Sequence, residues 1–355
     1  MLMTKQYLSD AVALLCDLIA TPRVSRSEGR AADLLFSRME QWGLSPVRIL
    51  NNVYALPAAF DAAKPTLLLN AHIDTVKAVS TWTRDPHSPD TVGGRLYGLG
   101  SNDCGGGLVS LLQVYRHFSG PAAAYSSYNL VFLASAEEEV SGKDGIACVL
   151  PLLPHVDVAL VGEPTGMQPA VAEKGLMVID GYCHGVSGHA AREEGVNAIY
   201  EALDDLAWLR DYRFTRVSPL LGPTKMTVTQ VESGTQHNVV PDLLHYVLDV
   251  RPNELYANEE ILDFLQGRMK HCRLKARSFR LRSSSIDGAH PLVQACLRMG
   301  LKPFGSPTLS DQALMTCPSL KMGPGDSARS HSADEYICLD EIESAIETYT
   351  TVIAG

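Results

Sequence analysis

A histidine and an aspartate, two residues apart, directly follow an apolar run in the first quarter of the chain. The run Leu67–Leu69 is continuously apolar, which predicts a strand buried on both faces, and His72 and Asp74 come just after it. Because residues i and i+2 of an extended chain point to the same side, the two side chains project together. Ligands of open α/β sheets bind at the carboxyl ends of the strands. The pair is therefore a candidate for metal or proton chemistry, against the alternative of a structural histidine at a strand end.

Asp103 lies at the mouth of a glycine-rich turn. The glycines Gly105–Gly107 precede a helix that is predicted to run from about Gly107 to Phe118, and they permit close approach of other backbone. Such a turn can also bind phosphate at a helix N-terminus. However, the segment lacks the Lys-Ser/Thr of a P-loop and the spacing of a dinucleotide fingerprint. A phosphate- or nucleotide-binding protein is thus the weaker alternative, and Asp103 is a candidate metal ligand.

Two further predicted strands also end in carboxylates. The apolar strand 129–134 is followed by the acidic run Glu137–Glu139, and the strand 156–161 is followed by Glu163. Adjacent carboxylates repel one another, and an isolated acidic run is typical of a solvated turn. At the end of a buried strand, a cation that offsets the repulsion explains the run better.

The candidate groups comprise two imidazoles and four carboxylates from five separate loops. They are His72, Asp103, Glu138, Glu139, Glu163 and His331, the last on a glycine- and serine-rich loop. Imidazole and carboxylate ligands suit zinc, and also cobalt or manganese. Two-metal hydrolytic sites hold their ions roughly 3.5–4 Å apart, and five ligands provide one bridging carboxylate and two more ligands per ion. The sixth group is then free to act as general base, and Asp74 to orient His72.

The length of 355 residues predicts two domains, and the element order changes after Gly175. From there the pattern predicts strand, helix, strand, strand, helix and strand at 176–183, 197–210, 224–231, 244–250, 258–270 and 273–281. This β-α-β-β-α-β order is the ferredoxin-like arrangement. We therefore expect an α/β catalytic domain with a central mixed sheet flanked by helices at 1–174 and 283–355. An α+β domain at 175–282 is inserted into it. Earlier in the chain, residues 47–55 are predicted to form one strand.

Composition and charge narrow the class of protein. Hydrophobic residues make up 46% and charged residues 20%, which is typical of a globular protein with a real core. The net charge of −10 and the lack of a basic patch argue against nucleic acid as a partner. No apolar run reaches the roughly 18 residues of a membrane span, and we see no signal peptide. The eight cysteines include no C-x-x-C pair, so we expect reduced thiols and a cytoplasmic location.

Five segments in order resemble the di-zinc amidohydrolase superfamily that contains acetylornithine deacetylase, succinyl-diaminopimelate desuccinylase, aminoacylase and glutamate carboxypeptidase. The segments are Asn70-Ala71-His72-Ile73-Asp74, Gly98-Leu99-Gly100-Ser101-Asn102-Asp103, Ala136-Glu137-Glu138-Glu139, Val161-Gly162-Glu163-Pro164 and Ser330-His331-Ser332-Ala333-Asp334-Glu335. The resemblance covers nearly the whole chain and is greatest to the short acetylornithine deacetylase branch, which includes deacylases of acylated citrulline. It implies a zinc-exopeptidase-like catalytic domain and an inserted lid or dimerisation domain.

The resemblance also implies a role for each ligand. His72 and Glu163 bind one zinc ion, Glu139 and His331 bind the other, and Asp103 bridges them. Glu138 is the general base and Asp74 orients His72. Family members often have a cis peptide just after the bridging aspartate, and Cys104 occupies a position at which relatives vary.

The acidic run leaves its register open. We align Glu138 and Glu139 with the Glu-Glu pair of the family, because a third acidic residue commonly precedes that pair. A shift to Glu137 and Glu138 is the alternative, since strand ends are poorly defined by sequence.

The resemblance further predicts the substrate class and its contacts. A glutamate at the position of Glu163 is typical of deacylases and carboxypeptidases, which favours an N-acyl amino acid. His189 of the inserted domain stabilises the oxyanion, and in dimeric relatives this histidine comes from the partner subunit, so we expect a homodimer through 175–282. Arg251 is a candidate for the substrate α-carboxylate, because guanidinium binds carboxylate bidentately. A surface salt bridge is its alternative role. Asn238 is a further polar contact.

The predicted reaction is hydrolysis of N2-acetyl-L-ornithine to L-ornithine and acetate, a step of arginine biosynthesis, with two zinc ions or with cobalt or manganese in their place. Alternatives with the same chemistry are an N-acetyl- or N-succinyl-citrulline deacylase, a succinyl-diaminopimelate desuccinylase, and a dipeptidase or carboxypeptidase. An alternative of another class is a non-catalytic metal-binding homologue.

Overall fold

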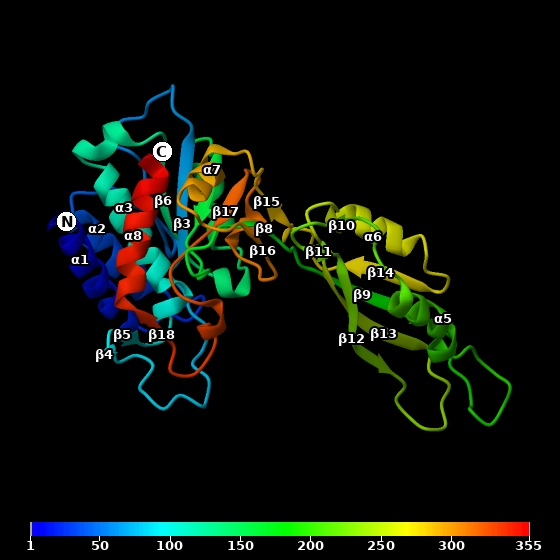
Figure 1. Ribbon diagram of the computed structural model, residues 1–355. Helices are drawn as coiled ribbons and strands as arrows, with labels where there is room; N and C mark the ends of the chain where they lie inside the picture. Colours follow the sequence, from blue (N-terminus) through cyan, green and yellow to red (C-terminus); the bar gives the residue numbers. More distant parts are fainter. Residues whose placement is uncertain (1, 355) are drawn as a thin grey trace. The chain divides into compact units, whose positions relative to one another are not determined.

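The computed structural model describes residues 2–354, which form two compact units (Figure 1). Unit 1 comprises Met1–Val171, Ser285–Phe304 and Ser310–Gly355, and unit 2 comprises Ala172–Ser284 and Gly305–Leu309. The predicted domain limits at residues 1 and 355 lie outside the described residues. Within that described part, no helix combines the length and the apolarity needed to cross a membrane.

Unit 1 is built on a mixed sheet whose described strands run in the order β1-β2-β6-β3-β7-β17-β8-β15, with β16 paired to β8. The strands are β1 (Pro46–Ile49), β2 (Asn52–Ala55), β3 (Thr66–His72), β6 (Asn129–Ser135), β7 (Val158–Val161), β8 (Ala170–Glu173), β15 (Ser284–Ser285), β16 (Phe304–Ser306) and β17 (Ser319–Lys321). Strands β6, β3, β7 and β17 are mutually parallel. His72 pairs with Ser135, and Asn70 pairs with Val161. The loops after β3, β6 and β7 therefore leave the sheet at the same edge.

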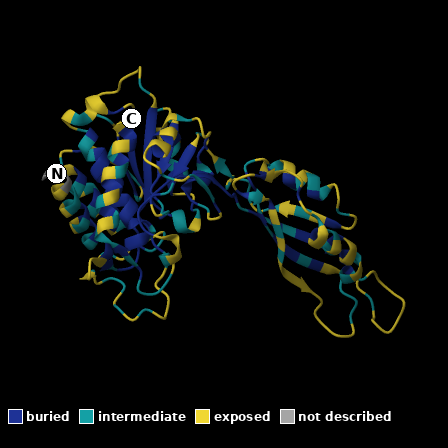
Figure 2. Cartoon of the chain, viewed as in Figure 1, coloured by how far each residue is buried: buried dark blue, intermediate teal, exposed yellow. Residues whose placement is uncertain are grey.

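Helices cover both faces of this sheet. They are α1 (Leu2–Ile19), α2 (Gly29–Gln41), α3 (Gly106–Phe118), α4 (Ile146–Val149), α7 (Pro291–Arg298) and α8 (Leu339–Ala354). Alternate residues of β3 belong to different cores, because successive side chains of a strand point to opposite faces. Leu67 and Leu69 pack in the cluster that includes α1, α2, α3, α7 and α8, whereas Leu68 packs in the cluster that includes α4. The central strands are buried throughout (Figure 2), which confirms the predicted α/β fold with a central mixed sheet flanked by helices.

Short elements complete unit 1. A separate small sheet runs in the order β18-β5-β4, formed by β4 (Asp90–Val92), β5 (Arg95–Tyr97) and β18 (Tyr336–Cys338). The short helical turns are η1 (Ser101–Gly105), η2 (Pro121–Tyr125), η3 (Glu138–Val140), η4 (Leu150–Leu152), η5 (Asp311–Leu314) and η6 (Ser327–Arg329). Two of these turns, η1 and η3, carry candidate site residues.

The single strand predicted at residues 47–55 is wrong. The structure has an antiparallel hairpin there, in which Ile49 pairs with Asn52. Leu50 takes a left-handed conformation with φ of 54°, which closes the turn. The apolar and polar residues of this stretch do not alternate in a way that reveals the reversal, and the turn lacks the glycine that usually marks one.

Unit 2 has the element order β9-α5-β12-β13-α6-β14 around an antiparallel sheet in the order β12-β13-β9-β14. The elements are β9 (Met177–His184), α5 (Ala198–Asp211), β12 (Lys225–Ser233), β13 (Leu243–Arg251), α6 (Asn258–Gln266) and β14 (Cys272–Ala276), with a short hairpin of β10 (Val217–Ser218) and β11 (Gly222–Pro223). Buried residues of α5 and α6 share one core with Ile179 and Leu248 of the sheet. The role of this unit as a lid or dimerisation domain stays a prediction.

Helix α3 meets the sheet by direct contact between backbones. A Cβ atom built on Gly107 would lie 1.7 Å from the carbonyl oxygen of Gly162. Gly107 belongs to the first turn of α3, and Gly162 follows β7 directly. Glycine at position 107 is therefore required for α3 to approach the end of β7, where Glu163 begins its loop.

We expect Gly107→Ala to destabilise unit 1 by about 2 kcal/mol or more, because the added methyl group meets backbone atoms that cannot rotate away. Gly120→Ala is the matched control at the other end of the same helix, since its Cβ would have only the carbonyl oxygen of His117 near it, at 3.8 Å. Thermal unfolding followed by circular dichroism measures both variants. Equal melting temperatures for the two variants would contradict the backbone contact.

Candidate metal centre

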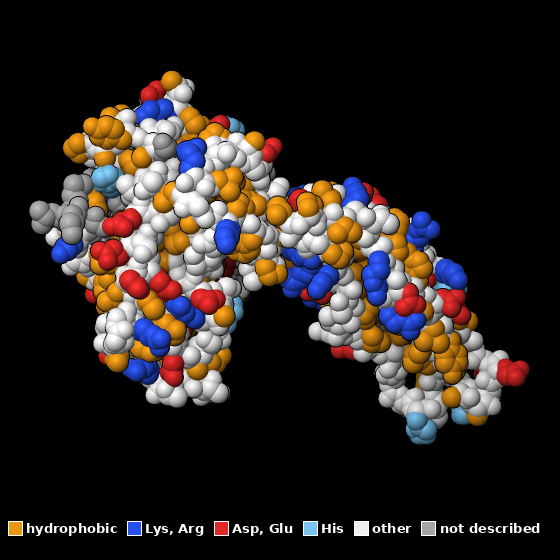
Figure 3. Space-filling view, viewed as in Figure 1, with side chains coloured by type: hydrophobic (Ala, Val, Ile, Leu, Met, Phe, Trp, Pro, Cys, Tyr) orange, Lys and Arg blue, Asp and Glu red, His pale blue; other side chains and the backbone are white. Residues whose placement is uncertain are grey.

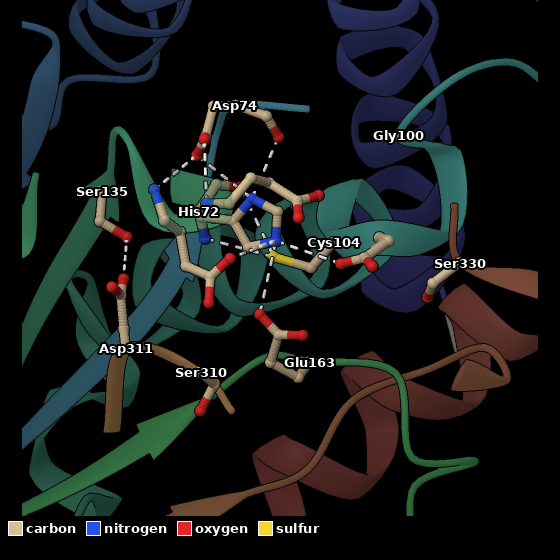
Figure 4. Close-up of polar contacts among 12 residues, drawn as sticks. His72, Asp74, Gly100, Cys104, Ser135, Glu163, Ser310, Asp311 and Ser330 are labelled. Carbon is tan, nitrogen blue, oxygen red and sulfur yellow. Dashed lines mark hydrogen bonds and ion pairs between the residues drawn. The ribbon is translucent and has the colours of Figure 1, made fainter. Parts of the chain in front are cut away.

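His72 is the last residue of the central strand β3, and its two ring nitrogens have different surroundings. Nδ1 lies 3.0 Å from the main-chain oxygen of Asp74 and 3.4 Å from its Oδ1. Nε2 lies 3.1 Å from Oδ1 of Asp103, 3.4 Å from Oε1 of Glu163 and 4.0 Å from Oε2 of Glu138 (Figure 4). The side chain is buried. One nitrogen is thus anchored to the protein, and the other faces three carboxylates.

Asp103 faces both candidate histidines. Its Oδ1 is the near neighbour of His72, while its Oδ2 lies 3.5 Å from Nε2 of His331. The peptide bond between Asp103 and Cys104 is cis. Burial alone would raise the pKa of Asp103, but the hydrogen bond and charge of His72 outweigh it and hold the pKa below its ordinary value. An ionised carboxylate with one oxygen toward each imidazole has the arrangement that a bridging ligand needs.

His331 and Glu139 form the second half of the cluster. Nε2 of His331 lies 2.9 Å from Oε2 and 3.2 Å from Oε1 of Glu139. The hydrogen bond to this carboxylate raises the pKa of His331 to about 9. A metal ion between these groups would take the place of the imidazolium proton.

Two carboxylates near His72 are largely buried, with 12% of the side chain of Glu138 and 14% of that of Glu163 exposed. Burial, reinforced by the charge of Asp103, raises the pKa of Glu163 to about 8. Burial also raises the pKa of Glu138 well above its ordinary value. Carboxyl groups in such a place stay ionised at neutral pH only when a positive charge offsets the desolvation and the mutual repulsion.

Glu138 and Glu139 lie on the turn η3, and Glu137 faces elsewhere. Glu137 has a left-handed backbone with φ of 55°, and its side chain packs against Gly142. Glu138 thus lies near His72 and Glu139 near His331. The roles of base and ligand in the register that we favoured stay a prediction.

The carboxylate of Asp74 ties β3 to this turn. Its Oδ1 accepts the backbone N–H of Glu138 at 3.1 Å, and its Oδ2 accepts the N–H of Glu139 at 3.2 Å and the hydroxyl of Ser25 at 2.6 Å. Asp74 therefore does more than face His72. It also holds the backbone of Glu138 and Glu139 in place.

The donor set suits a pair of metal ions. Ligand atoms of His72, Asp103 and Glu139 all lie within 4.8 Å of one another, and so do those of His72, Cys104 and Glu163. Together with His331, the five predicted ligands offer two imidazoles and three carboxylates around one shared aspartate, which is a coordination chemistry that zinc, cobalt and manganese accept.

Sequence reasoning missed some neighbours of the centre. Cys104 is buried, its sulfur accepts the N–H of His72 at 3.2 Å, and burial raises the pKa of its thiol. Asp311 of η5 accepts a 2.5 Å hydrogen bond from Ser135, whose hydroxyl in turn accepts from Asn70 at 2.9 Å. Cys104 was noticed as a variable position. The sequence did not predict the position of Asp311, because the residues around it show no periodic apolar pattern and lie far from β3 in the sequence.

The predicted substrate contacts His189, Asn238 and Arg251 belong to unit 2. His189 and Asn238 lie on neighbouring loops, where the N–H of Ala190 donates to the carbonyl of Asn238 at 3.0 Å. Arg251 ends β13 and binds both carboxylate oxygens of Asp249, at 2.9 and 3.1 Å. This salt bridge is the alternative considered for Arg251, and its contact with substrate stays a prediction.

Comparison with known proteins gives the family. The model of peptidase family M20/M25/M40 matches residues 68–355, which is more than half of the chain. The chain belongs to this family.

Curated and solved relatives of this M20 protein agree with that finding. It is 28% identical over 370 aligned residues to acetylornithine deacetylase of Proteus mirabilis, which covers 95% of this chain and 94% of the relative. It is also 28% identical to acetylornithine deacetylase of Edwardsiella ictaluri, in an alignment that covers 93% of this chain and 94% of the relative. The fold resembles that of YXEP from Bacillus subtilis, described as a dinuclear metal binding peptidase from the M20 family, with a TM-score of 0.76, 16% identity and coverage of 99% and 98% of the two chains. It also resembles aminopeptidase PepT from Bacillus cereus, with a TM-score of 0.76, 18% identity and coverage of 98% of each chain.

These findings confirm that the M20 protein is a metal-dependent amidohydrolase. YXEP is described as dinuclear metal binding, and the described residues of this chain supply groups that could hold metal ions. The metal and the substrate of this protein are matters for a proposal.

We expect Asp74→Ala to weaken metal binding about 10- to 100-fold, because it removes the group that fixes His72 and the Glu138–Glu139 turn. Metal content after dialysis against a weak chelator measures the effect. Asp157→Ala is the control, since Asp157 accepts the N–H of Thr66 at the opposite end of the same strand. A metal loss that is equal in both variants would mean that Asp74 acts only on stability.

Proposed function

We propose that this protein hydrolyses the amide bond of an N-acyl amino acid, with N2-acetyl-L-ornithine as the first candidate, releasing L-ornithine and acetate as in arginine biosynthesis. The observation that carries the proposal is a largely buried carboxylate, Glu138, beside a cluster in which Asp103 faces both His72 and His331. The acetylornithine deacetylases with which the chain aligns over more than nine-tenths of its length support the substrate class. A glutamate at position 163 also favours an acylated substrate.

We infer two zinc ions as the native cofactor, with cobalt or manganese as substitutes. His72 and Glu163 would hold one ion, Glu139 and His331 the other, and Asp103 both. When bound, such ions polarise the amide carbonyl and lower the pKa of water.

The proton transfers fall to Glu138. Its position beside His72 suits a base that takes a proton from the attacking water and later gives it to the leaving amine. The N–H of Glu138 is held by Asp74, so the base is oriented by the same carboxylate that faces His72. Burial keeps its proton affinity high, which suits the second transfer.

Substrate recognition is assigned to unit 2. His189 would donate to the oxyanion that forms at the attacked carbonyl. Arg251 would bind the α-carboxylate of the amino acid through two parallel hydrogen bonds. Because Arg251 already pairs with Asp249, the substrate carboxylate would have to displace Asp249 from the guanidinium or share the guanidinium with it. Asn238 would supply a further polar contact.

A homodimer through unit 2 and a cytoplasmic location are part of the same proposal. Apolar side chains on the edge strand β12 and on α5 are exposed: Tyr200 is 71%, Leu203 54% and Val231 53% accessible. Figure 3 shows apolar side chains on the surface of this part of unit 2. A second copy would remove them from water. Within residues 2–354 all eight cysteines are free, which supports a reducing compartment.

A panel of N-acetyl and N-succinyl amino acids tests the function. We expect the highest kcat/KM for N2-acetyl-L-ornithine, loss of activity on chelation, and recovery with Zn²⁺, Co²⁺ or Mn²⁺. The highest kcat/KM for an acylated citrulline, for succinyl-diaminopimelate or for a dipeptide would move the assignment to that substrate. Hydrolysis of none of them would overturn it. Arg251→Ala should raise KM for each accepted substrate more than it lowers kcat.

We expect Glu138→Gln to retain both metal ions and to lose about 10²- to 10⁴-fold in kcat, because glutamine cannot take the proton from water. Kinetics and metal analysis of the same preparation measure the two effects. Glu137→Gln is the matched control, since that neighbour packs against Gly142. Near-normal turnover of the Glu138 variant, with turnover lost in the Glu137 variant, would shift the base to Glu137.

A further inference from the structure

The turn that carries Asp103 is bound at four points by one residue of a distant loop. Glu335 accepts the N–H of Gly100 at 2.8 Å through Oε2, and the N–H groups of Asn102 at 2.8 Å and Asp103 at 2.9 Å through Oε1. Its main-chain oxygen accepts the N–H of Gly98 at 3.0 Å. The side chain of Glu335 is buried. A buried carboxylate that accepts several N–H bonds fixes backbone strongly, because each bond is charge-assisted.

A side chain of the turn, Asn102, in turn contacts the loop that carries His331. Oδ1 of Asn102 accepts the N–H of Asp326 at 3.0 Å, and Nδ2 of Asn102 donates to the carbonyl of Asp326 at 3.0 Å and reaches the hydroxyl of Ser330 at 3.4 Å. Asn102 is fully buried. Each segment therefore binds the backbone of the other through one buried side chain. We call Asn102 and Glu335, with these bonds, the reciprocal clamp.

The clamp lies immediately beside two ligands. Asn102 precedes Asp103 and Ser330 precedes His331, so the contact between Asn102 and Ser330 joins the neighbours of two ligands (Figure 4 labels Ser330). Glu335 also accepts the N–H of Asp103 itself. Because Oδ2 of Asp103 and Nε2 of His331 lie 3.5 Å apart, a shift of one loop relative to the other changes the space between them directly.

A buried arginine accompanies the clamp. Nη2 of Arg23 donates to the carbonyl of Gly100 at 2.8 Å, and the guanidinium interacts electrostatically with Glu335. A buried carboxylate is tolerated when an opposite charge and hydrogen bonds compensate its desolvation. Arg23 thus places a positive charge near Glu335, although burial still raises the pKa of that carboxyl to about 7.

The other ligands are held differently. His72 is the last residue of β3, and Glu163 comes two residues after the end of β7, the parallel strand next to it. The sheet's own hydrogen bonds position them. Asp103 and His331 come from loops, so their positions depend on side-chain bonds such as those of the clamp.

From this geometry we propose that Asn102 and Glu335 are positioning residues that set the second metal position, between Glu139, His331 and Asp103. They act by fixing the loop of His331 against the turn of Asp103. The proposal rests on the dinuclear centre of the proposed function, but it does not depend on the substrate.

Titration of the metal-free full-length protein with Zn²⁺ and with Co²⁺ tests it. Calorimetry follows Zn²⁺, and visible absorption follows Co²⁺. A His331→Ala variant identifies which of the two binding events belongs to the second position. We expect Asn102→Ala to raise the dissociation constant at the second position by about tenfold or more, because groups that orient metal ligands typically contribute this much to metal affinity. The dissociation constant at the first position should stay within a few-fold of the wild-type value. Glu335→Gln should weaken the same event, since its amide donor would face the N–H of Gly100.

Asn129→Ala is the matched control for stability. Asn129 is also buried in unit 1 and binds backbone at three points, accepting the N–H of Asp61 at 2.9 Å and donating to the carbonyls of Asp61 at 2.9 Å and Lys64 at 2.8 Å. This variant should lower the melting temperature and keep the ratio of the two metal dissociation constants.

Three outcomes overturn the proposal. Unchanged metal affinities in both clamp variants would mean that the clamp serves stability alone. An equal loss at both positions would mean that it does not act on the second one in particular. A wild-type protein that binds fewer than two ions would overturn both the clamp and the dinuclear centre. Failure to hydrolyse acetylornithine, with the metal results as expected, would overturn only the substrate assignment.

Discussion

The metal centre depends on holding mutually repelling carboxylates in a buried place beside two imidazoles. Glu138 and Glu163 lie near Asp103 and His72, and burial raises the pKa of both glutamates. Such a cluster costs free energy unless hydrogen bonds or cations compensate each charge. The proposed metal ions would compensate these charges, and N–H donors compensate the ones that they reach.

The chain positions these groups in two physical ways. The parallel register of β6, β3 and β7 brings three strand ends to one edge, so His72 and Glu163 follow from the sheet itself. The carboxylate of Asp74 holds the Glu138–Glu139 turn beside them. Backbone contact between Gly107 and Gly162 seats α3 against that edge. Asp103 and His331 lack such support and depend on long-range side-chain bonds.

Chemistry and recognition are assigned to different units. The ligands and Glu138 belong to unit 1, whereas His189, Asn238 and Arg251 belong to unit 2. A division of this kind lets substrate preference change in one unit while the hydrolytic groups of the other are kept. It also explains why similarity to acetylornithine deacetylases supports the reaction better than it supports the acyl group or the amino acid.

Local sequence by itself determined much of the protein, because apolar runs predict buried strands and the polar residues just after them mark their ends. His72, Glu138, Glu139 and Glu163 became candidate site residues in this way. The ordered motifs indicated the family, which the comparisons confirmed. The hairpin at 46–55 was missed because its turn carries no glycine signal. Only the tertiary structure decided the reciprocal clamp. Its bonds join residues 224 and 235 positions apart, from Asn102 to Asp326 and from Gly100 to Glu335. A contact between residues so far apart produces no periodic pattern in the sequence, since it forms only when the whole sheet has brought the two loops together.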